Sequence, residues 1–255
     1  MFHMSERRGS SPGTVEKALD LLAHLEGQRS PCGVSELGRD LAMPKPSVHR
    51  LLASLASRGY VERTDDGRYR LGFRLVGLGL AVLAREPLVE AARPALDAAA
   101  RAAGETYFLA ALRDGAVVVL DKVEGTAMLR AAPRIGESAP LHATAVGKLY
   151  LALAPTRVAI PAAPLERFTP RTLITAASLA RACGEVTRRG WAESREEWLP
   201  GLSFVAAPVR VGGELLGAVA AAVPSTRFAG TAKQKILKVT LDAARSIGAR
   251  LEGSS

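Results

Sequence analysis

The sequence is poor in cysteine, in aromatic side chains and in long apolar runs, and each shortage argues against a class of protein. Its 255 residues include two cysteines, Cys32 and Cys183, which lie far apart and near no pair of histidines. This favours neither a disulfide framework nor a zinc site, and it fits a reducing cytoplasm. The most apolar run, Ala218 to Val223, is only as long as a strand, and the opening MFHMSERRGSSPG lacks the apolar region of a secretory signal. We therefore expect a cytoplasmic protein without a membrane span, with a disordered tail over residues 1–11.

The sequence also lacks the common catalytic motifs. The stretch HATAVGKL ends in Gly-Lys, but His142 and Leu149 stand where a phosphate-binding loop needs Gly and Ser or Thr. No Gly-x-Ser-x-Gly motif occurs, and no Ser or Cys nucleophile is paired by motif with a histidine. Adjacent carboxylates such as Asp65 and Asp66 point apart and form no general acid–base couple. We expect no catalytic residue, no metal site, no cofactor and no enzymatic activity.

Positive charge is present in excess. The formal net charge is +9 and the isoelectric point is about 10.1. Residues 1–85 carry 13 Lys and Arg against 9 Asp and Glu, and the other 170 residues carry 21 against 16. The first third is thus nearly twice as basic per residue, which on its own favours a nucleic-acid partner only weakly.

Residues 12–72 have the pattern of a winged helix-turn-helix domain. A first helix over residues 15–28 is predicted to start at a Thr14 cap, and a short second helix over residues 36–42 at a Ser35 cap. After the turn at Met43-Pro44, a third helix repeats apolar residues at three- and four-residue spacing up to Gly59. Two alternating segments then flank a Thr-Asp-Asp-Gly turn, which predicts a hairpin. The predicted buried positions are Val15, Leu19, Leu22 and Leu25 of the first helix and Val48, Leu51, Leu52 and Leu55 of the third.

The outer side of the third helix is polar and basic. Side chains at the start of a recognition helix reach base edges, whereas later ones and the wing contact phosphates. The predicted DNA contacts are Lys45, Ser47, His49, Arg50, Ser54 and Arg58 on the helix, with Arg63, Arg68 and Arg70 beside the wing turn. The alternative is an ordinary solvated face. Taken together, the tight turn, the proline at the helix start and the basic hairpin favour DNA binding over a solvated face.

Residues 73–86 are predicted to form a linker helix that ends at Pro87. This segment is too apolar to stand alone in water, so we expect it to pack against a second copy of the chain. Burial within its own chain is the alternative. Pro94 is expected in the first turn of the next helix, or as a kink within it.

Residues 87–255 alternate between strand and helix patterns. Hairpin-linked strands with flanking helices indicate an antiparallel α+β domain. Strands are predicted over residues 106–113, 116–123, 128–132, 203–211 and 215–223, and helices over 144–153, 176–189 and 231–251.

The sequence resembles the IclR family of bacterial transcriptional regulators along nearly its whole length. The resemblance rests on ALDLLAHLEGQ, PKPSVHRLLASLASRGYVERTDDGRYRLG, RIGESAPLHATAVGK, EVTRRGWAESREE and PGLSFVAAPV. It implies a winged helix-turn-helix domain, a linker helix and a GAF-like effector-binding domain. It also implies homodimers or dimers of dimers on operator DNA, and control of a catabolic or stress operon by a small, often carboxylate-bearing metabolite.

An anion site is predicted at the start of the helix near Thr144. The first amides of that helix, near Ala145, Val146 and Gly147, have no partner within the helix and lie at the positive end of its dipole. Small side chains there let a ligand approach the backbone. A tight packing corner between helix and sheet is the alternative.

The resemblance places further effector contacts on the chain. They fall on Met128, Ala131, Ala139, Ala145, Val146, Ser194, Leu202 and Phe204. The family often carries an acidic residue in place of Ser194, Cys in place of Phe204, and larger aliphatic residues in place of Ala131 and Ala139. These departures predict a less acidic and roomier pocket with an aromatic wall, suited to a carboxylate larger than a two- or three-carbon keto acid.

We therefore expect a ligand-responsive, sequence-specific DNA-binding repressor. Two alternatives stay open at this point: an enzyme that turns over a small carboxylate, and a regulator that acts through protein partners without DNA.

Overall fold

The computed structural model describes residues 13–28, 30–126, 133–158 and 164–253. The strand expected over residues 128–132 lies outside the described residues, as do Met128 and Ala131. The chain divides between Arg85 and Glu86 into two units, each described here by itself.

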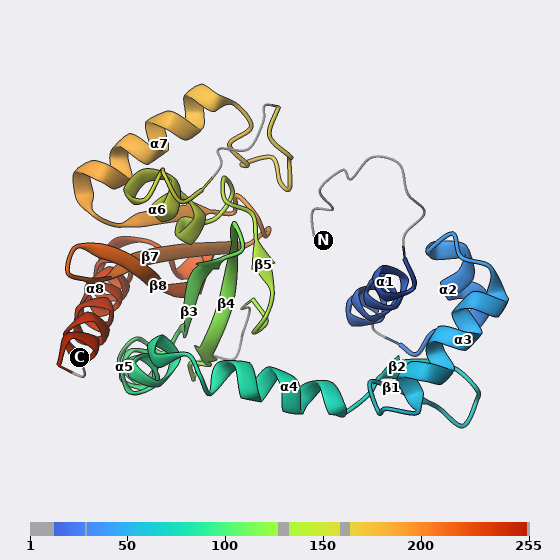
Figure 1. The fold of residues 1–255 in the computed structure, drawn as a ribbon. Coiled ribbons are helices and arrows are strands. Elements are labelled where there is room, and N and C mark those ends of the chain that lie inside the picture. The colour runs from blue at the N-terminus through green and yellow to red at the C-terminus, as the bar shows by residue number, and fades with distance from the viewer. Residues whose placement is uncertain (1–12, 29, 127–132, 159–163, 254–255) are drawn as a thin grey trace. The chain divides into compact units, whose positions relative to one another are not determined.

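The N-terminal unit is a small helical domain with a two-stranded hairpin (Figure 1). Its first three helices and the hairpin pack around one apolar cluster that includes Leu21, Leu37 and Leu52. Its elements are α1 (Thr14–Gly27), α2 (Val34–Asp40), α3 (Lys45–Ala56), β1 (Val61–Arg63), β2 (Tyr69–Leu71) and α4 (Arg74–Leu83). This is the predicted order of a winged helix-turn-helix domain followed by a linker helix.

The buried face of α1 differs from the predicted one. Val15 is 72% exposed and Leu19 is 59% exposed, whereas Leu21 is buried. Leu25 is buried as predicted, and Leu22 is half-buried. The prediction was wrong for Val15 and Leu19 because α1 carries apolar residues at helical spacing on two faces, and only the packing partner selects between them. The predicted caps were also wrong: α1 begins one residue earlier, at N-cap Gly13, and α2 begins two residues earlier, at N-cap Gly33.

Carboxylates complete the two glycine caps. The Glu16 side chain accepts a hydrogen bond from the Gly13 amide at 2.7 Å, and the Glu36 side chain accepts one from the Gly33 amide at 3.2 Å. Each carboxylate thus satisfies an amide that the helix itself leaves unpaired.

The third helix and the hairpin agree with the sequence pattern. Val48, Leu51 and Leu52 are buried. Gly59 adopts a φ of +73°, which ends the helix and directs the chain into the hairpin. In the hairpin, β1 pairs antiparallel with β2, and Tyr69 also bridges to Cys32.

The linker helix α4 has no buried residue. Leu80 is 61% exposed and Val82 is 65% exposed. Burial of this helix within its own chain, the alternative weighed for it, is therefore not found among the described residues.

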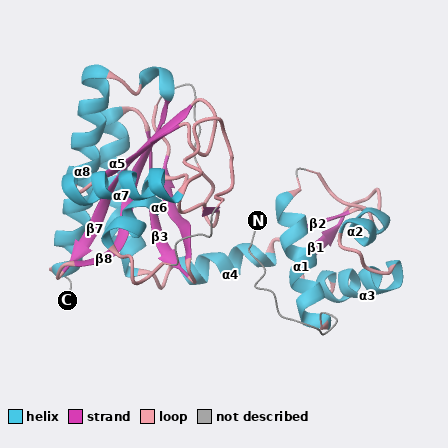
Figure 2. Cartoon of the chain, turned by 90° about the horizontal axis from the view of Figure 1, so that it is seen from above, coloured by secondary structure: helices cyan, strands magenta, loops and turns pink. Residues whose placement is uncertain are grey.

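The C-terminal unit is a six-stranded antiparallel sheet covered on both faces by helices (Figures 1 and 2). The strand order is β5-β4-β3-β8-β7-β6. The strands are β3 (Thr106–Arg113), β4 (Ala116–Val123), β5 (Ser138–Ala139), β6 (Ala192–Arg195), β7 (Leu202–Val211) and β8 (Glu214–Pro224). The helices are α5 (Pro87–Ala103), α6 (Ala145–Leu153), α7 (Ala176–Arg189), the short η1 (Ser225–Arg227) and α8 (Gly230–Glu252).

Each face of the sheet has its own apolar cluster. Helices α5 and α8 pack on one face around Leu96, Val205 and Ile247, and α6 and α7 lie over the other around Leu149 and Phe204. Strands alternate between the two faces, so neighbouring residues of β7 contribute to different clusters.

Most predicted elements of this unit are present within a residue or two of their predicted ends. Pro87 opens α5, and Pro94 lies inside that helix rather than in its first turn. The short strands β5 and β6 were not predicted, because two to four residues carry too little alternation to be recognised.

Candidate DNA-binding face and effector cavity

Helix α3 presents its cationic side to solvent. Lys45, His49 and Arg50 are exposed, while the Val48, Leu51 and Leu52 side chains are packed inside the domain. Pro44 is the N-cap, and no acidic side chain lies in the first turn of the helix. The geometry on which the DNA-binding hypothesis depends is therefore present.

The remaining predicted contacts on α3 are less uniform. Ser47 is half-buried. Ser54 and Arg58 are exposed, and the Arg58 guanidinium donates to the Ser54 carbonyl and hydroxyl oxygens, both at 3.2 Å. Arg58, which lies just beyond the end of α3, is thus bonded to the last turn of that helix, and contact with a phosphate would need these bonds to be exchanged.

The three wing arginines have different surroundings. Arg68 donates through Nε to the Pro31 carbonyl at 2.6 Å and through a terminal nitrogen to Glu36 at 2.9 Å. It therefore joins the wing to the start of α2. Arg70 forms an exposed pair with Glu62 at 3.0 Å. Arg63 is exposed beside the wing turn, and it forms no ion pair within the described residues.

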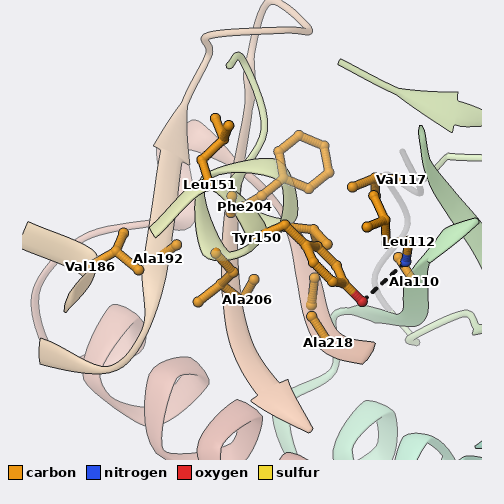
Figure 3. Packing of buried hydrophobic residues seen from close by; sticks show 14 of the residues in the cluster. Ala110, Leu112, Val117, Tyr150, Leu151, Val186, Ala192, Phe204, Ala206 and Ala218 are labelled. Carbon is orange, nitrogen blue, oxygen red and sulfur yellow. Dashed lines mark hydrogen bonds between the residues drawn. The ribbon is translucent and has the colours of Figure 1, made fainter. Parts of the chain in front are cut away.

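An apolar cavity lies between the sheet and the start of α6. Figure 3 shows the packing in this region, with Phe204, Val117 and Ala110 labelled. The Phe204 ring meets the Phe108 ring edge-on, with centroids 6.2 Å apart. The lining residues are Phe108, Ala110, Val117, Val119, Pro133, Ala139, Thr144, Ala145, Val146, Trp198, Phe204 and Ala220.

Four of the predicted effector residues line this cavity: Ala139, Ala145, Val146 and Phe204. The predicted aromatic wall is present, but the predicted roominess is not found in the described residues. About 20 Å³ is open to the centre of a water-sized sphere, which is room for about one water molecule. Phe108, Phe204 and Trp198 occupy the space beside the small alanine side chains of the lining. A metabolite would therefore have to displace lining side chains such as Trp198.

The start of α6 is partly satisfied by its own cap. The Thr144 hydroxyl donates to the Pro140 carbonyl at 2.8 Å and accepts from the Gly147 amide at 3.0 Å. The prediction that the Gly147 amide has no partner was therefore wrong. The Ala145 and Val146 amides make no hydrogen bond within the described part of the chain.

Gly147 serves packing rather than ligand access. A Cβ at this position would lie 2.2 Å from the Leu141 carbonyl oxygen, a distance that no side chain tolerates. Any residue other than glycine would push the start of α6 away from the loop before it.

Ser194 and Leu202 are buried but do not line the cavity. Ser194 is paired with Phe204 across β6 and β7, so both side chains point to the same face of the sheet. Ser194 is 1% exposed, and its hydroxyl has no hydrogen-bond partner among the residues that the structure describes. A buried polar atom without a partner requires a physical reason, and a ligand group close to Phe204 would provide one.

A buried ion pair holds α6 against the segment that carries Trp198. The Lys148 ammonium lies 2.6 and 2.8 Å from the two carboxylate oxygens of Glu197. Burial lowers the pKa of Lys148 and raises the pKa of Glu197 from their usual values. Sequence reasoning missed this pair, because the two residues are far apart in the chain and neither belongs to a recognisable motif.

His142 has a structural role. Its Nε2 lies 2.8 Å from the Glu166 carbonyl oxygen, and its ring packs against Phe168. Within the described residues, no group of three or more His, Cys, Asp or Glu side chains is placed to hold a metal ion. None of the helices described in the structure is long and apolar enough to cross a membrane.

Sequence reasoning also missed most of the cavity wall. Phe108 and Ala110 of β3, and Val117 and Val119 of β4, alternate along their strands and so face the same side. The alternation was visible in the sequence, but nothing in it indicated which of the two faces encloses a cavity.

Two family models match the sequence. The IclR helix-turn-helix domain matches residues 14–65, and the C-terminal domain of bacterial IclR transcriptional regulators matches residues 80–249. The first match covers most of the N-terminal unit, and the second covers the end of α4 and nearly all of the C-terminal unit.

Individual proteins agree with this result. The chain is 32% identical over 238 residues to the HTH-type transcriptional regulator BhcR of Paracoccus denitrificans, covering 91% of this chain and 85% of BhcR. A crystal structure of an IclR-type regulator from Silicibacter sp. TM1040 has a TM-score of 0.77 and 31% identity, covering 94% of this chain and 96% of that one. An IclR homologue of Microbacterium hydrocarbonoxydans, crystallised with 4-hydroxybenzoate, shares the fold with a TM-score of 0.78 at 23% identity, covering 95% of this chain and 100% of that one.

The family models, the BhcR relative and the winged helix with its exposed cationic face lead to one conclusion: the chain belongs to the IclR family of bacterial transcriptional regulators, with a DNA-binding helix-turn-helix domain.

Proposed function

We propose that this regulator represses a catabolic operon and releases it in response to a small carboxylate. The exposed cationic side of α3, opposite the buried Val48, Leu51 and Leu52, supports the DNA-binding part of this proposal. The unpaired Ala145 and Val146 amides beside an apolar cavity support the carboxylate part.

In the proposed complex, the start of α3 lies in the major groove. Lys45, Ser47, His49 and Arg50 face base edges, and Arg50 can bind guanine through two hydrogen bonds. Ser54, Arg58, Arg63 and Arg70 meet phosphates, and Arg68 contributes by holding the wing in place.

An operator-binding measurement tests this assignment. Arg50→Ala is expected to weaken binding of the full chain to the DNA upstream of its own gene by about 1–3 kcal/mol. The control is Arg101→Ala, which removes the same charge from an exposed position on α5 in the other unit. Equal affinity of the Arg50 variant and the parent, or an equal loss in both variants, would reject the assignment.

The cavity recognises a carboxylate through backbone amides. Its described lining has no charged side chain, and its single hydroxyl, that of Thr144, is already bonded. The Ala145 and Val146 amides lie at the positive end of the α6 dipole, where an anion is stabilised. The aromatic rings of Phe108 and Phe204 favour an aromatic or otherwise bulky apolar body on the ligand. A protein of the same fold was crystallised with 4-hydroxybenzoate, a ligand of this class.

Proline at the first position of α6 tests the amide contact selectively. Ala145→Pro removes one N–H donor, yet proline suits this position and the extended backbone of Thr144 before it. We expect benzoate binding to weaken by about 1.5–3 kcal/mol, the value of a hydrogen bond to a charged group, while binding of uncharged benzamide changes little. Ala176→Pro is the matched control, because α7 also has a threonine N-cap followed by alanine.

Calorimetry with both ligands distinguishes the outcomes. Preferential loss of benzoate binding in Ala145→Pro alone supports the site. If the parent binds only glyoxylate-sized acids, or if the variant keeps its preference for benzoate over benzamide, the proposed ligand class is wrong. Recovery of altered ligand after long incubation would favour the enzymatic alternative.

We infer that the regulator works as a homodimer or a dimer of dimers through α4. A helix with no buried residue and with Leu78, Leu80 and Val82 exposed is unfavourable in water unless another surface covers it. Leu80→Asp is expected to dissociate the assembly in sedimentation velocity experiments, whereas Arg85→Asp, just beyond the helix, is not. An unchanged sedimentation coefficient in Leu80→Asp would contradict the inference.

A further inference from the structure

A second concave site lies in the C-terminal unit, formed by residues that do not line the apolar cavity. Arg195 and Ser203 are paired neighbours on β6 and β7, one residue along from Ser194 and Phe204, and so they point to the other face of the sheet. The groove holds about 280 Å³ and is lined by Arg171, Arg195, Glu196, Ser203, Ser225, Thr226 and Phe228.

The two arginines of this groove have unused hydrogen-bond donors. The nearest carboxylate is 3.6 Å from Arg171 and 3.7 Å from Arg195, and neither guanidinium donates a hydrogen bond within the described residues. Nearby Arg227, by contrast, holds both oxygens of Glu105 at 2.9 and 2.8 Å. The Arg171 and Arg195 side chains are 63% and 50% exposed, so they can turn toward a ligand.

Positive charge exceeds negative charge around the groove. The Glu193 carboxylate alone lies within 4.0 Å of three cations, those of Lys233, Arg195 and Arg189. Glu196 is the one carboxylate among the described residues that line the groove, and it lies 3.6 Å from Arg171. With Arg171 and Arg195 against Glu196, the groove lining carries one excess positive charge.

Hydroxyl groups complete the donor set. The Ser203 and Ser225 hydroxyl oxygens lie 2.9 Å apart and share one hydrogen bond, so one of their two hydrogens is still available. Ser203 is 2% exposed and therefore fixed in position. The Arg195 guanidinium lies 5.5 Å from the centre of the Phe228 ring, which limits the directions in which it can point.

The backbone beside Arg195 is also held in an unusual conformation. Glu196 has a φ of +55°, which non-glycine residues rarely adopt. Its amide donates to the Leu202 carbonyl at 2.8 Å, and its carbonyl accepts from the Thr169 hydroxyl at 2.5 Å. These bonds hold Arg195 and Glu196 at the edge of the groove even when no ligand is bound.

We propose that this groove binds a tetrahedral oxyanion, the phosphate group of a small phosphorylated molecule or inorganic phosphate, between Arg171 and Arg195. The donors come from four separate segments, the Arg171 loop, β6, β7 and η1, so they can approach the several oxygens of a tetrahedral group from different sides. A phosphate monoester carries about −1.5 to −2 charges at pH 7, opposite in sign to the excess charge of the groove lining. The site is independent of the carboxylate cavity and of DNA binding.

Titration calorimetry of the full-length chain tests the site at constant ionic strength, with inorganic phosphate, phenyl phosphate and acetate as probes. Arg171→Gln and Arg195→Gln are each expected to weaken phosphate binding at least tenfold. Glu196→Gln should tighten it severalfold, because it removes the one carboxylate that lines the groove. Arg181→Gln, on the exposed side of α7, is the matched control and should leave it unchanged.

The two phosphate probes separate the sources of the ligand. Tighter binding of phenyl phosphate indicates a phosphorylated metabolite, and tighter binding of inorganic phosphate indicates the free ion; both support the site. Absence of saturable phosphate binding, equal binding of acetate, or an equal loss in Arg181→Gln would overturn the proposal. The proposal is also overturned if the parent does not bind phosphate and Arg195→Gln changes another property. A changed oligomeric state would then assign the groove to contact with another copy of the chain, and a changed DNA affinity would assign it to DNA.

Discussion

The buried pair between Lys148 and Glu197 permits a quantitative test of how α6 is held beside the cavity. Lys148 is 3% exposed, and its ammonium contacts both oxygens of Glu197. Lys148→Met keeps most of the side-chain volume but leaves the Glu197 carboxylate buried without a countercharge. Breaking a buried pair in this way costs about 3–5 kcal/mol.

This cost is measurable as a shift in melting temperature. A unit of this size loses roughly 2–4 °C per kcal/mol, so Lys148→Met is expected to lower the melting temperature of the C-terminal unit by roughly 6–20 °C. Glu197→Gln is expected to have a similar effect, because it leaves the ammonium unpaired. The double variant Lys148→Met with Glu197→Met removes both charges and should melt close to the parent, since apolar residues of similar volume replace buried pairs at little cost.

The pH dependence supplies an independent check. Burial already raises the pKa of Glu197, and loss of the lysine removes the attraction that opposes this rise. In Lys148→Met, the folded state then takes up a proton at a higher pH than the unfolded state does. The stability of this variant relative to the parent should therefore increase as pH falls from 7 toward 5.

Differential scanning calorimetry of the parent, both single variants and the double variant at pH 7 and pH 5 completes the test. If both single variants melt within a degree of the parent, the two charges are not buried as the structure shows. If the double variant loses as much stability as the two single variants combined, side-chain packing rather than charge accounts for the effect.

Three further predictions concern individual contacts. Gly147→Ala should destabilise the C-terminal unit by about 3 kcal/mol or more, because its Cβ would clash with the backbone of Leu141. Gly184→Ala on α7 should stabilise the unit by about 0.5–1 kcal/mol, because a Cβ there has open space and alanine favours the helix. Thermal denaturation measures both effects. Tyr150→Phe should cost about 1–3 kcal/mol in chemical denaturation, because the Tyr150 hydroxyl accepts from the buried Leu112 amide at 3.0 Å (Figure 3), and an unchanged midpoint would show that the bond is dispensable. Arg68→Ala should destabilise the N-terminal unit by about 1–2 kcal/mol and Arg70→Ala by less than about 0.5 kcal/mol, since only Arg68 bridges to a distant backbone carbonyl; equal melting of the two variants would refute that difference.

The architecture of both units was largely predictable, because its elements repeat their apolar residues at the helical or strand period. The predicted bounds of α7, β3 and β4 coincide with the structure. The stripe of α3 was identifiable because its opposite side is polar, so a single apolar face was available. On α1, Leu25 is buried as predicted, but Val15 and Leu19 are exposed and Leu21 is buried instead, because a periodic pattern alone cannot choose between two apolar faces.

The candidate sites could be predicted only where the charge of a side chain identifies them in the sequence. The cationic residues of α3 could be identified because charge stands out beside a buried stripe. The pair of Lys148 with Glu197 and the groove at Arg171 and Arg195 join residues that are distant in the chain. Their proximity depends on which strands are neighbours in the sheet, and no local sequence pattern predicts that strand order.

The segment before Lys148 shows why small residues were ambiguous. Alanine and glycine permit a close approach to the backbone, but they do not indicate whether a ligand or the protein itself makes that approach. In the structure, the Leu141 backbone fills the space beside Gly147, and the Gly147 amide donates its hydrogen bond to the Thr144 hydroxyl. Only the Ala145 and Val146 amides are left for an anion. Because two donors rather than three are available, loss of either one should remove about half of the hydrogen bonding to a carboxylate, which makes Ala145→Pro the most informative single substitution at this site.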